Sequence, residues 1–259
     1  MSLSFAWAFA SLVALVDPVA SPPPGVAPAA TDASVVARLD ELWKRRDDPA
    51  VLAEQKALID KTLPRAGKDY GFMWRAARLY FWISDDPAVG RDERTRVGKY
   101  AWDLGERAVA LNPNDVAGHF WAMGGMGNYS LGLGVVRALA QRIEGKFRER
   151  ITRAEALDPG YAQGGIPVAW GRYYAKMPWP KYDEKKARAN YARALQINPN
   201  NLRARVFLAE LMLEEDQPAE ARRLLEEVIN APVGKYDAPE EKRCKILAAR
   251  ALRKANEDK

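Results

Sequence analysis

Cysteine and histidine are almost missing from this sequence of 259 residues, which contains only Cys244 and His119. A single cysteine excludes a disulfide bond within the chain. A single histidine excludes a metal site built from several imidazole ligands. We therefore expect no metal and no cofactor, and we expect packing of apolar side chains to stabilise the fold.

The sequence also lacks any useful length of strict apolar and polar alternation, which is the pattern of a half-buried β-strand. Alanine is abundant and runs of β-branched residues are scarce, and this composition favours helix over sheet. Hydrophobic residues make up 48% and charged residues 29% of the chain, a balance typical of a globular protein and not of a disordered one. The sequence therefore predicts an all-α fold.

Long blocks of like charge are missing too, although the formal net charge is +6. Basic residues alternate with acids, as in residues 91–94 and 183–188, and such mixing is typical of solvated helix faces. Recognition of nucleic acid needs basic residues gathered on one surface. We expect no nucleic-acid partner.

The uncharged run near the start, Leu3 to Val16, is shorter than the ~20 residues that a membrane-spanning helix needs. It fits the apolar core of a secretory signal peptide, and Ala27-Pro28-Ala29 has the spacing of a cleavage site, with Ala20 as a rival. The alternative is an uncleaved membrane anchor. We expect residues 1–30 to be a signal peptide and a Pro/Ala-rich linker, residues 31–259 to be one folded domain, and the protein to be periplasmic or secreted.

A recurring helix ending marks the rest of the chain. Leu111-Asn112-Pro113, Leu157-Asp158-Pro159 and Ile197-Asn198-Pro199 each close a helical segment. Proline lacks an N–H and restricts the residue before it, so it ends one helix and allows the next to begin. Five residues before each proline stands an alanine whose small side chain lets two helices approach closely: Ala108, Ala154 and Ala194.

These endings predict five helix pairs and a closing helix. We expect helices at 34–46 with 48–63, 69–84 with 91–111, 115–127 with 133–157, 161–176 with 183–197, 202–215 with 218–230, and a C-terminal capping helix at 238–256. Stacked pairs of this kind bury their apolar faces on one another and form a solenoid.

The last pairs are similar to the tetratricopeptide repeat. The final two boundary prolines are 33 residues apart, close to the 34 residues of that repeat. The positions that match its pattern of small and large side chains are Ala187, Tyr191, Ala194, Leu208, Ala209, Met212, Ala221, Leu225 and Val228. The predicted fold is a tetratricopeptide-like helical-repeat superhelix.

Longer stretches resemble two groups with repeats of this kind. AEALDPGY at 154–161, AWGRYY at 169–174 and ARANYARAL at 187–195 resemble the TatT family, the T component associated with some TRAP transporters. WRAAR at 74–78 and HFWA at 119–122 are similar to the regulator of microtubule dynamics family. The resemblance implies a protein-binding or solute-gathering role. The first group implies a periplasmic partner, a TRAP substrate-binding protein.

Three features suggest chemistry but have simpler interpretations. The glycine-rich stretch 124–134 has no phosphate-loop spacing, and we interpret it as a wide turn between helices that come close together. His119 has no obvious nucleophile beside it and is expected to be structural. Asp47-Asp48-Pro49 and Asp85-Asp86-Pro87 are expected to stabilise the N-termini of following helices. We expect no enzymatic activity.

Aromatic residues recur on the first helix of successive pairs, which in tetratricopeptide-like folds lines the concave surface. Most are expected to pack in the core, and those left exposed would suit a binding groove. We expect exposure of Trp74, Trp82, Trp121, Tyr129, Tyr173 and Trp179. The candidate residues for binding a partner or ligand are Trp74, Trp82, His119, Trp121, Tyr129, Trp170, Tyr173 and Trp179.

The sequence thus predicts an exported, non-catalytic binding or scaffold protein that holds a protein or peptide partner in a concave aromatic groove. The alternative is a carrier of a small apolar ligand, with a pocket near residues 119–134 and 170–179. The sequence leaves open whether the chain forms a homo-oligomer.

Overall fold

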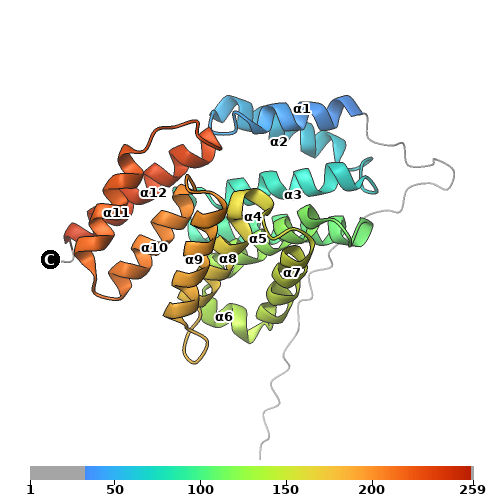
Figure 1. Ribbon diagram of the computed structural model, residues 1–259. Helices are drawn as coiled ribbons and strands as arrows, with labels where there is room; N and C mark the ends of the chain where they lie inside the picture. The colour runs from blue at the N-terminus through green and yellow to red at the C-terminus, as the bar shows by residue number, and fades with distance from the viewer. Residues whose placement is uncertain (1–32, 258–259) are drawn as a thin grey trace, which may run out of the picture.

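Helix follows helix through the part of the chain that the structure describes, residues 33–257 of a computed structural model (Figure 1). No β-strand occurs within that range. The predicted all-α class is confirmed. The predicted signal peptide and linker, residues 1–30, lie outside the described residues.

The helices are arranged in pairs, as the proline-marked boundaries predict. The pairs are α1 (Ala33–Trp43) with α2 (Pro49–Thr62), α3 (Tyr70–Ser84) with α4 (Arg91–Leu111), α5 (Val116–Leu133) with α6 (Val135–Ala140) and α7 (Ile143–Leu157), α8 (Tyr161–Lys176) with α9 (Glu184–Ile197), and α10 (Leu202–Glu214) with α11 (Pro218–Asn230). The closing helix is α12 (Ala238–Glu257). The three alanines before the boundary prolines, Ala108, Ala154 and Ala194, are fully buried, as their role in close packing requires.

Short polar residues begin many of these helices. The Asp48 carboxylate accepts hydrogen bonds from the backbone N–H groups of Ala50 and Val51, and Pro49 occupies the first turn of α2. This cap confirms the expected role of the Asp47-Asp48-Pro49 segment. The parallel expectation for Asp85-Asp86-Pro87 is wrong, because no helix begins there: Asp85 ends α3, and α4 begins only at Arg91.

The glycine-rich stretch is not a turn. Residues 124–133 continue α5, and the expected second helix at 133–157 is divided into α6 and α7. The glycines instead allow α4 and α5 to touch along their backbones, so the predicted close approach is correct while its location in a turn is wrong. We call the four glycines of this contact the glycine seam: Gly98 and Gly105 on α4, and Gly125 and Gly132 on α5.

The glycine seam leaves no space for side chains. A Cβ atom at Gly105 would lie 2.4 Å from the Cα atom of Ala122, and one at Gly125 would lie 2.4 Å from the backbone nitrogen of Trp102. Glycine costs roughly 0.5–1 kcal/mol in a helix interior relative to alanine. Close packing of two helix backbones offsets that cost here.

The two ends of the superhelix meet. Arg46, just after α1, forms an ion pair of 2.7 Å with Asp237, just before α12. Lys242 of α12 pairs with Asp47, and the Arg243 guanidinium donates a hydrogen bond of 2.8 Å to the carbonyl of Trp82. Figure 1 shows α12 beside the α1–α2 pair. The repeats therefore form a closed ring in place of the open concave surface that the sequence predicts.

None of the helices in residues 33–257 combines the length and the apolar character needed to cross a bilayer. Ile246 of the closing helix α12 is half exposed. The buried face of α12 is formed by Cys244 and Ala248, which pack against α10 and α11.

The glycine seam generates a stability prediction. Gly125→Ala places a Cβ atom against the backbone of α4, so we expect the free energy of unfolding to fall by about 2 kcal/mol. Gly145, in the exposed first turn of α7, has nothing within 4 Å of an added Cβ atom. Gly145→Ala is therefore expected to raise the free energy of unfolding by about 0.5 kcal/mol. Urea unfolding of both variants checks this, and equal effects would contradict it.

Candidate functional site

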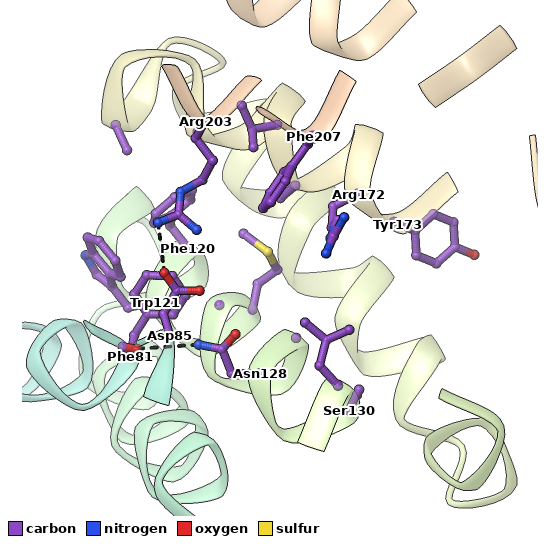
Figure 2. A pocket seen from close by; sticks show the side chains of 18 of the residues that line it. Phe81, Asp85, Phe120, Trp121, Asn128, Ser130, Arg172, Tyr173, Arg203 and Phe207 are labelled. Atoms are coloured by element: carbon purple, nitrogen blue, oxygen red, sulfur yellow. Dashed lines mark hydrogen bonds and ion pairs between the residues drawn. The ribbon is translucent and has the colours of Figure 1, made fainter. Parts of the chain in front are cut away.

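Closure of the ring leaves a cavity of about 640 Å³ on its inner side. Side chains from α3, α5, α6, α7, α8 and α10 form most of its wall, and Trp43 of α1 and Leu247 of α12 also line it. Figure 2 shows Arg203 and Asp85 beside Phe120 and Trp121, and Arg172 between Phe207 and Tyr173. The cavity therefore has an apolar part formed by aromatic rings and a charged part that adjoins it.

The apolar wall is a continuous set of aromatic contacts centred on Trp121. Its indole meets Trp43 at 6.1 Å, Phe81 at 5.4 Å and Phe120 at 4.9 Å between ring centroids. The Phe120 ring contacts Tyr161 at 5.2 Å. Edge and tilted contacts at these distances are favourable beyond the area that they bury. This wall is rigid, since each ring is held by at least one other.

The charged part is organised around Arg203 of α10. Its guanidinium pairs with Asp85 at 2.8 Å and with Glu240 at 2.5 Å, which joins α10 to the end of α3 and to α12. Arg243 lies 3.5 Å from the same Asp85 carboxylate. Together with the pairs at the ends of the ring these residues make up what we call the closure network: Arg46, Asp47, Asp85, Arg203, Asp237, Glu240, Lys242 and Arg243.

Burial and charge act in opposite directions on the closure network. Burial alone would raise the pKa of the Glu240 carboxyl, but the neighbouring Arg203 outweighs it and holds that pKa below its ordinary value of 4.5. Burial lowers the pKa of Arg243, which also lies beside Arg203. Glu240 is therefore an anion at neutral pH, and its negative charge compensates the Arg203 guanidinium.

A second cation lines the cavity from α8. The Arg172 guanidinium pairs with Glu210 of α10 at 2.5 Å and lies 4.2 Å from the centre of the Phe207 ring. Its Nε atom is buried and has no hydrogen-bond partner within the part of the chain that the structure describes. Burial alone would lower the pKa of the Arg172 guanidinium. The charge of Glu210 and its hydrogen bond more than compensate and raise that pKa.

The turn that starts α8 forms another part of the wall. Ala162 and Gln163 have φ values of 53° and 56°, in the left-handed region, and Gly164 follows at 87°. Such a conformation costs a non-glycine residue roughly 1–2 kcal/mol. The carbonyl of Gln163 accepts a hydrogen bond of 2.9 Å from the Asn201 side chain, which holds the turn in place.

Three of the predicted site residues line the cavity: Trp82, Trp121 and Tyr173. Their predicted exposure is wrong, because they are only 3%, 8% and 8% exposed. Closure of the ring covers Trp82, since the guanidinium groups of Arg46 and Arg243 lie over its indole at 4.3 Å and 3.1 Å. The Tyr173 hydroxyl donates a hydrogen bond of 2.7 Å to Glu144.

The other five predicted residues do not line the cavity. Trp74 is half-buried, not exposed as expected, and lies against Arg75 and Arg78. Tyr129 is also half-buried and donates to Gln141. Trp170 donates through its indole nitrogen to Glu155 at 2.9 Å. Trp179 is 88% exposed, as predicted, on the loop between α8 and α9.

His119 has a structural role in this fold, as expected. Its Nε2 atom lies 3.0 Å from the carbonyl oxygen of Pro113, at the helix boundary of its own repeat. Burial lowers its pKa below 6.5, so the ring is neutral at physiological pH. Burial also raises the pKa of the Cys244 thiol, which keeps it protonated. In residues 33–257 no cluster of three or more His, Cys, Asp or Glu side chains is arranged to hold a metal.

Sequence reasoning missed Asp85, Arg172, Arg203 and Phe207 as cavity residues. Asp85 has the sequence context of a helix cap, and the arginines stand in helices where alternating charge is typical of a solvated face. No local spacing signals that Asp85 meets Arg203, because the two residues are 118 positions apart. Only the closure of the ring brings them together.

The closure network generates a prediction that depends on pH. Because the folded pKa of Glu240 lies below 4.5, its pair with Arg203 stabilises the fold above that pH and loses this effect as the pH falls further. Arg203→Met leaves the carboxylate without its main partner, so we expect a loss of about 3 kcal/mol at pH 7. The loss should shrink below pH 4.5, where Glu240 becomes neutral in the variant.

Chemical denaturation at pH 7 and at pH 4 measures this difference. The matched control is Arg96→Met, which removes an exposed pair with Glu93 and is expected to change stability little at either pH. A loss in Arg203→Met that stays the same at both pH values would show that packing, and not charge, is responsible.

Comparison with known proteins supports the fold. Residues 182–234 match the family model described as a tetratricopeptide repeat, and this matched part spans α9, α10 and α11. No curated protein matches the chain. The crystal structure of a thermophilic tetratricopeptide-repeat protein from Thermus thermophilus superimposes with a TM-score of 0.61 at 18% sequence identity, covering 85% of this chain and 98% of that one. The chain therefore has a tetratricopeptide-like helical-repeat fold.

Proposed function

We propose that this protein is a non-catalytic scaffold that binds an apolar segment of a protein partner in its central cavity. The observation that carries the proposal is the aromatic wall around Trp121, which borders a cavity of about 640 Å³ inside a tetratricopeptide-like ring. Folds with these repeats are typical of protein-interaction scaffolds. An apolar segment that enters this space exchanges water for contact with several fixed rings.

The polar groups of the cavity fit a role in binding better than a role in catalysis. Arg203 and Arg172 are each paired with carboxylates of other helices, so their charges are already compensated. His119, whose side chain could act as a base, contacts a backbone carbonyl and does not line the cavity. A catalytic site needs an activated nucleophile or a base aimed at the substrate.

Export and a TRAP transporter partner are part of the same proposal. The apolar run from Leu3 to Val16 supports passage out of the cytoplasm, and residues 154–195 resemble the TatT family. We therefore propose a periplasmic substrate-binding protein as the partner. Purification of the complete chain from the periplasm of its own organism, followed by identification of stoichiometric partners, tests this point.

A second candidate function is transport of a small apolar ligand. The cavity volume falls within the roughly 300–1,000 Å³ typical of small-molecule sites. In that case native mass spectrometry of the purified protein should show a retained small molecule. The Gly127 and Gly145 variants described next distinguish both functions from binding at a surface outside the cavity.

Gly127→Leu tests whether the cavity is the binding site. Gly127 lines the cavity, and an added Cβ atom would meet only the Phe147 ring, at 3.9 Å. Leucine there projects into the cavity and takes up part of its volume, and it also favours the α5 helix, so we expect a stable protein that binds its partner or ligand less well. Gly145→Leu is the control, because its side chain enters solvent.

Pull-down and native mass spectrometry are compared for the two variants and the unaltered protein. Binding should fall at least about tenfold in Gly127→Leu and stay unchanged in Gly145→Leu. Equal recovery of the same partner by both variants would refute the cavity as the site.

A further inference from the structure

The two most exposed large apolar side chains of residues 33–257 lie at one end of the cavity. Trp179 is 88% exposed on the loop after α8, and Val136 is 72% exposed on α6. Their neighbours Val135 and Met177 line the same cavity. We call this region the α6–α8 end, and Figure 1 shows α6 and the loop between α8 and α9 together at one end of the molecule.

Contacts between side chains hold the two apolar groups in one region. Lys181, two residues after Trp179, forms an ion pair with Glu144 in the first turn of α7. The same Glu144 carboxylate accepts a hydrogen bond from the hydroxyl of Tyr173 on α8. The loop that carries Trp179 is therefore fixed to the element that directly follows α6. Prolines on both sides of Trp179 restrict the loop further.

The two segments that form the α6–α8 end carry a net positive charge, and Glu214 and Glu215 near the end of α10 lie against them, bonded to Lys176 and Tyr182. Residues 135–149 contain four basic and two acidic residues, and residues 176–188 contain five basic and two acidic ones. Their net charge of +5 compares with +6 for the whole chain, so the rest of the protein is nearly neutral. The exposed basic residues of the two segments include Arg137, Arg142, Arg148, Lys181, Lys185 and Lys186.

We propose that the α6–α8 end docks on an anionic lipid bilayer, with Trp179 and Val136 inserted among the headgroups. Tryptophan is favoured at the boundary between lipid and water because its ring is apolar and its N–H remains hydrated. Lysine and arginine side chains around it are attracted to anionic lipids. A protruding indole together with exposed basic side chains on the same segments has the composition of an interfacial membrane contact.

An acidic protein partner fits the same charge but not the same shape. Anchors of protein interfaces are buried in pockets of the partner and are surrounded by a matching rim. Trp179 and Val136 protrude from two separate elements, a short loop and a six-residue helix. A lipid surface adapts to such projections without a matched pocket. This proposal does not depend on which molecule occupies the cavity.

Vesicle cosedimentation of the complete chain tests the proposal. We expect binding to vesicles of phosphatidylglycerol and phosphatidylcholine in equal parts, and weaker binding at high salt or with phosphatidylcholine alone. The double variant W179S/V136S should bind at least about tenfold more weakly. The control I246S/V233S removes two exposed apolar side chains from the α12 region and should bind like the unaltered chain.

A second arm tests the charge. R137E/K185E and R253E/K254E change the net charge equally, but the second pair lies on α12. Only R137E/K185E should weaken binding. Equal loss in both would show that the total charge of the protein, and not this surface, attracts the vesicles, and would overturn the proposal.

A probe at position 136 separates this contact from membrane binding through residues 3–16. Val136→Cys is labelled with an environment-sensitive dye, and the natural cysteine, Cys244, is buried. Anionic vesicles should shift its emission to the blue, with no shift for a dye at Ile246→Cys. No shift at position 136, or a shift produced by polyglutamate and not by vesicles, would refute the lipid contact, the latter in favour of an acidic protein.

Discussion

The contact on which the rest of this structure depends is the pairing of Arg203 with Asp85 and Glu240. These groups come from α10, the end of α3 and α12, and they meet only because the chain returns to its starting point. A buried charge without a partner is strongly unfavourable, so the Arg203 guanidinium and the two carboxylates compensate one another's charge. Closure therefore depends on charge compensation as well as on the apolar packing that joins neighbouring repeats.

A closed ring changes what a repeat protein of this class offers to a partner. An open solenoid presents its concave side as a groove, and aromatic side chains there remain in contact with solvent. Here Arg46 and Arg243 cover Trp82, and Trp43 packs against Trp121. The inner surface becomes a cavity in which aromatic rings and charged groups lie next to one another. Which molecule the cavity binds then depends on both the volume and the polarity of that molecule.

The helix boundaries could be predicted from the sequence because local chemistry determines them. Proline after Asn112 and Asn198 ends helices whatever the tertiary structure, and Ala108 and Ala194 are buried because the repeat demands it. The location of the glycine seam could not be predicted, since glycine is common both in turns and in close helix contacts. The sequence predicted a pocket near residues 119–134 and 170–179, and both segments line the cavity. The ion pairs of the cavity could not be predicted, because Asp85 and Arg203 meet across 118 residues of sequence.

The glycine seam and the junction between the two ends of the ring are different kinds of contact. At the seam the backbones of α4 and α5 touch directly, so these two helices cannot shift against each other without a clash. The junction between α12 and the α1–α2 pair consists of charged side chains, of which Arg46 and Arg243 are buried over the Trp82 indole. Replacing these charges by neutral groups would therefore loosen the two ends of the ring and leave the contact in its middle unchanged.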